Sequence, residues 1–395
     1  MNDFTMVIPS YWGQNKGAEQ PADKAVFDHP TSLGSEGTLG RLLESLEIFD
    51  RVPGKIVIIA VANLKELAVE VEQKIDRIIA PFRRYYNITC LGQRKLEKIR
   101  NRLTTDKRVS PKAMAMVNLE SYAAVRNICS LAGILEGSPY TVYIDDDEVF
   151  EDKFFLQKIA GNMGSSLGED TVSALAGYYL QPDTYLLDES KVPSWREQHW
   201  NNAAAMNRAF EQIIGRGERL KPTPFVFGGN MALSLEALQK VPFDPKITRG
   251  EDIDFLLNLR INGITFYLDR ELSIKHLPPP SDQPSWKKVR EDTVRFLYER
   301  KKLLDHPELS LDDLKPYPGM FLGDDLEERI IKTCELLIEK YESGQNRQGV
   351  VECRKIIEMV REKPFDTIDT RTWLEKVTAD WREVTGAATS LGIPE

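Results

Sequence analysis

The segment KIVIIAVAN, residues 55–63, constrains the fold more than any other stretch of the chain. It is a continuous run of β-branched and small apolar residues, without the alternation of apolar and polar positions of a half-exposed strand. A strand of this kind is buried on both faces, which is typical of a parallel sheet covered by helices on both sides. The segment LKELAVEVEQKIDRII (64–79) follows directly and has the helical period of such a covering helix.

Strand and helix patterns alternate over the first 180 residues. This alternation predicts an α/β domain with a mostly parallel, doubly wound sheet. In such sheets, ligands bind beyond the carboxyl ends of the strands. Besides 55–63 and 64–79, the expected strands are 4–10, 88–92, 141–145 and 171–180, and the expected helices are 38–49, 119–137 and 152–165.

The chain changes character twice after residue 180. Residues 181–224 combine a loop, two tryptophans and a helix, and we expect them to form an insertion over the active-site face. Strands are expected at 264–269 and 271–276. A proline run then introduces amphipathic helical segments at 291–304, 325–342 and 346–362. We therefore predict a catalytic domain at 1–277 and a helical extension at 278–395, whose apolar stripes also suit homo-oligomer formation.

The stretch TVYIDDDEVF (141–150) places four acids, Asp145, Asp146, Asp147 and Glu148, at the end of an expected strand. Acids are favoured where the next helix begins, but Glu151 and Asp152 already serve that purpose. Hard divalent cations bind carboxylate oxygens, and Mg²⁺ commonly sits between one or two carboxylates and substrate phosphates. The acids therefore predict a cation site at this edge of the sheet.

Five motifs in order resemble the nucleotide-sugar-dependent glycosyltransferases of the A fold, particularly the inverting family 2. The resemblance covers roughly residues 4–277. It implies the Rossmann-like nucleotide-diphospho-sugar transferase fold and transfer of a sugar to an acceptor hydroxyl. The motifs are MVIPSYW (6–12), AVRNICSLA (124–132), YIDDDEVFED (143–152), FGGNMALSLEAL (227–238) and RGEDIDFLLNLRINGI (249–264).

The resemblance also implies roles for individual residues. Asp252 matches the general base of inverting members, with Glu251 beside it in the catalytic motif. Asp147 matches the ligand of a Mn²⁺ or Mg²⁺ ion that bridges the diphosphate, and His276, at the end of a strand, matches a histidine that completes the metal site in several enzymes of this fold. The donor-binding residues implied are Pro9, Tyr11, Asn63, Arg126, Asp145, Asp146 and Gly229.

One departure from the family pattern bears on the donor. The second strand of many members ends in an acid that reads the nucleobase, whereas this strand ends at Asn63. The sequence therefore leaves the choice between a UDP- and a GDP-sugar open. The segment from Gly13 to Glu36 is longer than the usual loop at this place. It could cover the nucleotide or contact a partner chain. His29, within this segment, is a further candidate for the cleft.

Other interpretations of the same residues remain open. Glu251 and Asp252 also suit the N-terminus of a helix. A retaining enzyme of the same fold, similar to mannosylglycerate or glucosylglycerate synthases, would carry the same acids and a downstream histidine. A nucleotidyltransferase is a second alternative. It would need a glycine- and Arg/Lys-rich loop after the first strand, which PSYWGQNKG matches poorly. A non-catalytic sugar-nucleotide-binding protein is a third alternative.

Composition narrows the range of possible partners and cellular locations. A net charge of -9 argues against a nucleic-acid-binding surface, although the basic stretch from Arg94 to Lys112 is either a solvated helix or an anion-attracting rim. No apolar run is long enough for a membrane span. The four cysteines form no CxxC pair and no signal-like start precedes them, so we expect reduced thiols and a cytoplasmic protein. The acceptor is left open as a saccharide, another small molecule or a lipid-linked molecule.

Overall fold

The computed structural model describes residues 4–14, 27, 30–52, 54–181, 183–279 and 283–394. Most of the long segment after the first strand, including His29, lies outside these residues. The part of the loop PSYWGQNKG that follows Gln14 also lies outside them. The expectations for both therefore stay predictions.

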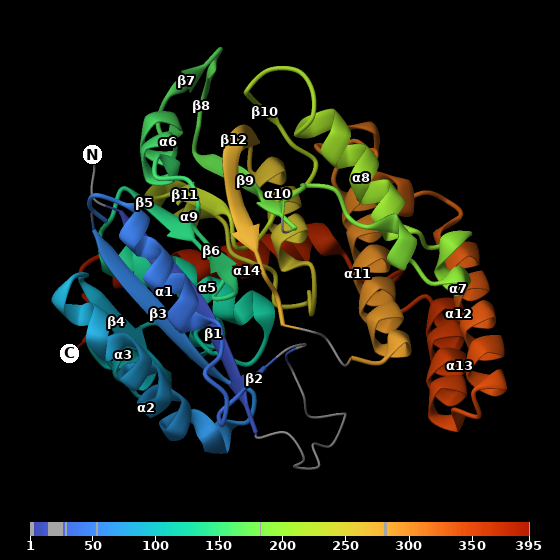
Figure 1. Ribbon diagram of the computed structural model, residues 1–395, viewed down its shortest axis with the longest axis horizontal. Helices are drawn as coiled ribbons and strands as arrows, with labels where there is room; N and C mark the ends of the chain where they lie inside the picture. The colour runs from blue at the N-terminus through green and yellow to red at the C-terminus, as the bar shows by residue number, and fades with distance from the viewer. Residues whose placement is uncertain are drawn as a thin grey trace.

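A single large sheet organises the described part of the chain, with strand order β10-β12-β9-β11-β5-β1-β3-β4 (Figure 1). The short strand β2 (Thr31–Ser32) pairs with β1, and β6 (Glu148–Val149) pairs with β12. The remaining strands are β1 (Thr5–Gly13), β3 (Lys55–Ala62), β4 (Ile88–Leu91), β5 (Tyr140–Tyr143), β9 (Ala174–Leu180), β10 (Leu220–Pro222), β11 (Met231–Ser234) and β12 (Phe266–His276), and β7 (Ser166–Leu167) and β8 (Asp170–Thr171) form a separate hairpin.

The strand directions confirm a mixed, mostly parallel sheet. β4, β3, β1 and β5 run parallel to one another, and β9 and β12 form a second parallel pair. β11 joins the two groups and is antiparallel to both β5 and β9. The carboxyl ends of β1 and β5 therefore lie at the same edge of the sheet, where the predicted acids follow β5.

Both faces of the sheet are buried, as the run 55–63 predicts. Val57 and Ile59 belong to one hydrophobic cluster and Ile56 and Ile58 to the other, so alternate side chains of β3 point to opposite faces. One face carries α1 (Leu39–Ser45), α2 (Ala68–Ile79) and α6 (Phe155–Asn162). The other carries α3 (Gln93–Thr105), α4 (Pro111–Met114), α5 (Tyr122–Leu135), α9 (Leu235–Lys240) and α10 (Glu251–Ile261).

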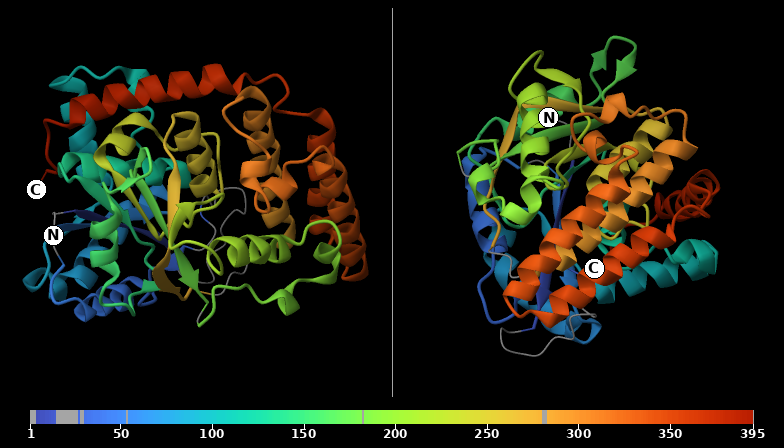
Figure 2. Two further views of the ribbon diagram at one scale, coloured as in Figure 1. Left: turned by 90° about the horizontal axis from the view of Figure 1, so that it is seen from above. Right: turned by 90° about the vertical axis from the view of Figure 1, so that its right-hand side faces the viewer.

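The chain after Leu277 forms four long helices, and the last returns to the sheet. These are α11 (Ser285–Asp305), α12 (Leu326–Ser343), α13 (Arg347–Glu362) and α14 (Thr370–Ala388). Figure 2 shows α14 crossing most of the molecule from the side of α13 toward α3 and α4. Their apolar residues continue the hydrophobic cluster that covers one face of the sheet. The helices thus share a core with the predicted catalytic domain.

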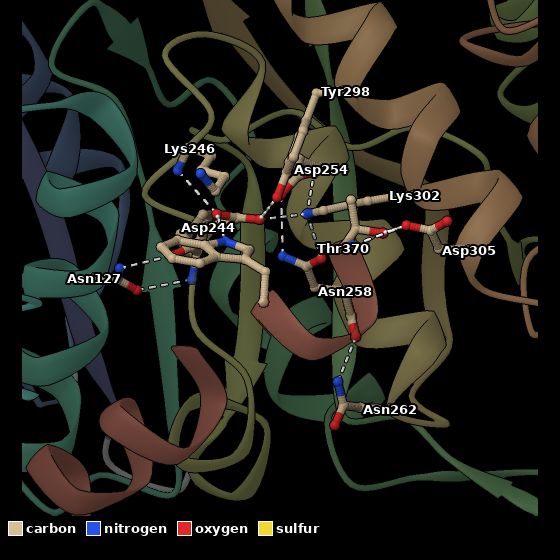
Figure 3. A network of polar contacts seen from close by, with 12 residues as sticks. Asn127, Asp244, Lys246, Asp254, Asn258, Asn262, Tyr298, Lys302, Asp305 and Thr370 are labelled. Atoms are coloured by element: carbon tan, nitrogen blue, oxygen red, sulfur yellow. Dashed lines mark hydrogen bonds and ion pairs between the residues drawn. The ribbon is translucent and has the colours of Figure 1, made fainter. Parts of the chain in front are cut away.

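A buried polar network fastens α10 to these helices (Figure 3). The ammonium of Lys302, fully buried on α11, lies 2.9 Å from Asp244 and 2.7 Å from Asp254 of α10. Asp244 also accepts hydrogen bonds from Tyr298 at 2.8 Å and Trp373 of α14 at 3.0 Å. The helix that begins with Glu251 and Asp252 is therefore held directly by α11, and α14 joins the same network through Asp244.

Several local expectations change in the structure. The two strands expected at 264–269 and 271–276 are one strand, β12, with an irregular register between Leu268 and Ser273. The insertion 181–224 contains α7 (Ser194–Glu197) and α8 (Asn202–Ile213), but it also supplies β10 to the sheet edge. In the basic stretch, Arg102 donates to the carbonyl of Gly392 and Lys112 pairs with Asp380, so part of it holds α14 and the residues after it. Within the described ranges, no helix is both long and apolar enough to cross a membrane.

Candidate active site

A cavity of 320 Å³ lies beyond the carboxyl ends of β1 and β5. The turn after β5 forms one wall, and the N-terminus of α10 forms another. The hydroxyl of Tyr11, at the end of β1, is buried there without a hydrogen-bond partner among the described residues. Of the predicted site residues, the cavity is lined by Pro9, Tyr11, Arg126, Asp145, Asp146, Asp147, Glu251 and Asp252.

Arg126 joins the two acidic motifs of this cavity. It projects from α5, which starts at the N-cap Ser121, and only 5% of its surface is exposed. Its Nη1 lies 2.9 Å from Oδ1 of Asp145, and its Nε donates to Oε1 of Glu251 at 3.2 Å. Burial alone would lower the pKa of Arg126, but the two carboxylates outweigh burial and raise that pKa well above its usual value. Arg126 therefore carries a charge that holds both acids in place.

Asp145 is also held by Tyr179, which the sequence did not single out for the site, and by Glu148. Its carboxylate accepts from the hydroxyl of Tyr179 at 3.4 Å, and its backbone N–H donates to Glu148 at 3.2 Å. Glu148 is fully buried, and it accepts this hydrogen bond from the backbone. Burial, reinforced by Asp145 and Asp147, raises the pKa of Glu148 well above its usual value.

Two glycines allow the backbone to approach this cluster. A Cβ at Gly229 would lie 2.1 Å from Oε1 of Glu148 and 2.7 Å from Asp145, and a Cβ at Gly228 would lie 2.5 Å from the Arg126 guanidinium. Gly229 itself lies behind Asp145 and outside the lining of the cavity. These glycines thus allow the backbone to lie close to the acids and to Arg126.

Asp146 faces the end of β1. Its Oδ2 accepts from the hydroxyl of Ser10 at 2.5 Å. Burial, with a smaller contribution from Asp147, raises the pKa of Asp146 to about 7. Three consecutive acids thus have three different surroundings, and the turn separates their side chains.

Asp147 and His276 meet because β6 pairs with the end of β12. Glu148 is opposite His276 in this antiparallel pair, and the N–H of Leu277 donates to the carbonyl of Asp147 at 3.0 Å. The His276 Nε2 lies 3.5 Å from Oδ2 of Asp147, and its ring stacks on Tyr179 with 4.4 Å between centroids. Arg41 of α1, another residue that the sequence did not single out, donates to the carbonyls of Asp147 and Leu277.

The pair fits part of a divalent cation site. No group of three or more His, Cys, Asp or Glu side chains in the described ranges is placed to hold a metal ion. One carboxylate and one imidazole are nevertheless suitable ligands when substrate phosphates and water supply the others. Asp147 and His276 would hold Mn²⁺ or Mg²⁺ in that way.

Asp252 and Glu251 begin α10 after Gly250, whose φ of 71° is in the left-handed region. One carboxylate oxygen of Asp252 accepts from the N–H of Ile253 at 2.8 Å, and the other accepts from the N–H of Gly228 at 3.1 Å. The helix-terminal interpretation therefore holds for Asp252, and it coexists with a position on the cavity wall. Glu251 also lies in the first turn of α10, and it accepts from Arg126 as well.

The structure does not bring Asn63 into this cavity. Asn63 directly follows β3 and lines a separate cavity of 610 Å³. Its side-chain oxygen accepts from the N–H of Phe27 at 3.3 Å. Trp12, Trp195 and Trp200 are all buried in the hydrophobic clusters, so none of them offers an exposed ring for a sugar to stack on.

Comparisons with known proteins add little to this geometry. No family model and no curated protein sequence matches the chain. The mannosyltransferase PcManGT from Pyrobaculum calidifontis, solved in complex with GDP-Man and Mn²⁺, is 12% identical over 99% of this chain and 89% of its own, with a TM-score of 0.45. A crystal structure of a mycobacterial protein is 13% identical over 75% of this chain and 74% of its own, with a TM-score of 0.39. Both likenesses are too weak to assign a family.

Proposed function

We propose that this chain is a metal-dependent glycosyltransferase that moves a sugar from a nucleotide-sugar donor to an acceptor hydroxyl. The observation that carries the proposal is the bridge from Arg126 to Asp145 and Glu251. It joins the acidic turn after β5 to the first turn of α10 in one cavity. A purely structural role for either acidic motif would not require that both motifs line the same cavity.

The donor side of the site comprises Asp145, Asp147 and His276. Asp145, held by Arg126, suits a contact with the ribose or sugar of the donor. Asp147 and His276 would hold the cation beside the diphosphate. A bound divalent cation would stabilise the negative charge that develops on the departing diphosphate.

Asp252 is the proposed general base of an inverting transfer. Its carboxylate would accept the proton of the acceptor hydroxyl while the acceptor oxygen forms a bond to the anomeric carbon. The bond from that carbon to the diphosphate breaks, and the nucleoside diphosphate leaves with the bonding electrons. The N–H groups of Gly228 and Ile253 orient the base, because each donates to one of its oxygens.

Donor binding tests the proposal directly. A ligand that binds the folded state alone raises the melting temperature. We expect a UDP- or GDP-sugar, in the presence of Mn²⁺ or Mg²⁺, to raise the Tm of the wild type and to leave that of Asp147→Asn unchanged. Asp313→Asn, with an exposed carboxyl outside the cavity lining, is the matched control. If no UDP-, GDP- or ADP-sugar raises the Tm with either metal, the proposal is wrong.

The stereochemical outcome needs its own measurement. Inversion by Asp252 predicts a β-linked product from an α-linked donor. Proton NMR of the anomeric centre distinguishes the two linkages. An α-linked product from the same donor would exclude the inverting mechanism in favour of the retaining one.

A further inference from the structure

A second and larger cavity, of 1380 Å³, adjoins the first. Arg249 lines both cavities, and His276 lines the larger one within 3.5 Å of Asp147 on the wall of the smaller. The walls of the larger cavity come mainly from the segment between β9 and α8 and from one face of α11. It therefore lies on the side of the site away from β1 and β3.

The two cavities have opposite charge. Among the described residues, five carboxylates and two arginines line the smaller cavity. In the larger one, two carboxylates, Asp188 and Asp292, face six cationic side chains in a chain whose net charge is -9. The six are Arg41, Lys191, Arg196, Arg249, Lys288 and Arg295.

Carboxylates hold three of the arginines in position. Arg249 pairs with Glu291 at 3.1 Å and Arg295 with Glu299 at 2.8 Å. Neither glutamate belongs to the cavity lining. Arg196 pairs with Asp292 at 3.1 Å, and the same oxygen of Asp292 accepts from Trp200 and Asn202. These three arginines are thus fixed before any ligand arrives, which lowers the entropic cost of binding an anion.

Arg295 carries an unused donor. Only 7% of its surface is exposed, its Nε is bound by Glu299, and its Nη1 donates to the hydroxyl of Tyr317 at 3.4 Å. Its Nη2 is buried without a hydrogen-bond partner among the described residues. A buried N–H without an acceptor is costly, and an acceptor oxygen of a ligand that reached Nη2 would remove this cost.

The helix α11 aligns the relevant side chains. Lys288, Asp292 and Arg295 are four and three residues apart, so they share one face of the helix. Asp292 is occupied by the insertion, and Lys288 and Arg295 line the cavity one helical turn before and after it. The guanidinium of Arg295 also lies 2.5 Å from the position of a Cβ at Gly250, directly before the acids of α10.

We propose that the acceptor carries an anionic group, a phosphate or a carboxylate, that binds in the 1380 Å³ cavity to Arg295, Lys288 and Arg196. This inference rests on the proposed glycosyltransferase function. The anion would sit on the α11 side, while the hydroxyl that receives the sugar points toward Asp252. Arg41 and Arg249, at the junction of the two cavities, are placed nearer to the donor.

Isothermal titration of the full chain in the absence of donor tests this inference. The probes are glucose 6-phosphate, glucuronate and glucose, which share a sugar ring and differ in the anion. A charge-assisted contact is about 1.5–3 kcal/mol, so we expect one of the anions to bind at least about tenfold tighter than glucose. The comparison of the two anions separates a phosphate site from a carboxylate site.

Variants locate the bound anion. Lys288→Gln should weaken binding of the preferred anion at least about fivefold, and Arg295→Gln should weaken it further where that variant folds. Lys332→Gln, which removes an exposed lysine of α12 outside the cavity lining, is the charge-matched control and should leave binding unchanged. Equal binding of all three probes, or an unchanged affinity in Lys288→Gln, overturns the inference.

A competition experiment separates this inference from the proposed function. The preferred anion should bind together with the nucleoside diphosphate that the donor screen selects. Displacement of the anion by that nucleotide would assign the cationic cavity to the donor and overturn the inference, with the glycosyltransferase proposal intact. Failure of every nucleotide-sugar to bind would instead contradict the proposed function.

Discussion

Arg126 and Glu251, which are 125 residues apart in the chain, lie 3.2 Å apart at the bottom of the candidate site. The same guanidinium holds Asp145 at 2.9 Å. A single buried cation thus fixes the relative positions of the turn that would bind the donor and the helix that would carry the base. Small errors in such positions are expensive in catalysis, because reacting groups must meet within a narrow range of distance and orientation.

Replacement of Arg126 tests this relationship. Arg126→Met leaves the buried Glu251 and the half-buried Asp145 without their cation, and we expect a loss of about 3–5 kcal/mol in the free energy of unfolding, measured by urea denaturation. The double variant Arg126→Met/Glu251→Gln removes one of the two stranded charges and should recover part of that loss. A single variant as stable as the wild type would show that the bridge has no structural importance.

Gly229 tests how tightly the acids are packed. An alanine Cβ at this position would lie 2.1 Å from Glu148. Gly229→Ala should therefore displace Glu148 and Asp145, and it should lower the Tm and donor affinity together. Gly161→Ala is the matched control, because a Cβ at Gly161 in α6 meets nothing within 4 Å and alanine stabilises a helix by about 0.5–1 kcal/mol relative to glycine. Equal effects of the two substitutions would contradict the predicted crowding.

The network around Lys302 predicts that α11 supports α10. Lys302→Met removes the cation between two buried carboxylates, Asp244 and Asp254. We expect unfolding to become easier by about 3–5 kcal/mol in urea denaturation. Lys332→Met, which breaks an exposed pair with Glu328, should change stability by less than about 1 kcal/mol. A Lys302→Met variant as stable as Lys332→Met would rule out this support.

Glu299 should make stability depend on pH. Burial raises the pKa of its carboxyl to about 7 although Arg295 lowers it, whereas an unfolded glutamate titrates near about 4.3. As pH rises between these values, the unfolded chain ionises first, so the folded state loses up to about 4 kcal/mol. Glu299→Gln removes this loss.

Urea denaturation of both proteins at pH 5 and pH 8 measures the effect. The free energy of unfolding of Glu299→Gln minus that of the wild type should be larger at pH 8 than at pH 5. A stability difference between the two proteins that is the same at both pH values would mean that Glu299 stays ionised throughout.

Sequence patterns anticipated much of the fold and most of the cavity lining. The run 55–63 indicated a strand buried on both faces, and β3 has that environment because its β-branched residues suit both hydrophobic clusters. Arg126, Asp145 and Glu251 were predicted from motifs, and the structure places them in contact. Local periodicity and motif spacing are properties that a single sequence displays directly.

The supporting contacts could not be predicted in the same way. The burial of Glu148 depends on the turn that lets it accept from the N–H of Asp145. Tyr179 reaches Asp145 only because β9 lies between β11 and β12, and its sequence context, GYYL, looks like that of any buried strand. The packing of α14 against α4, α5 and α9 is also not indicated by any local pattern in the sequence. Such contacts join distant segments, so they follow from tertiary packing.

The release of nucleoside diphosphate tests the central claim most directly. It is measured with the donor selected by the binding screen and with Mn²⁺ or Mg²⁺ present. We expect turnover by the wild type, loss of turnover on chelation of the metal, and a decrease of at least about 100-fold in both Asp147→Asn and Asp252→Asn, with Asp313→Asn unchanged. Turnover that persists in Asp147→Asn and under chelation would contradict the assignment of this cavity as a metal-dependent glycosyltransferase site.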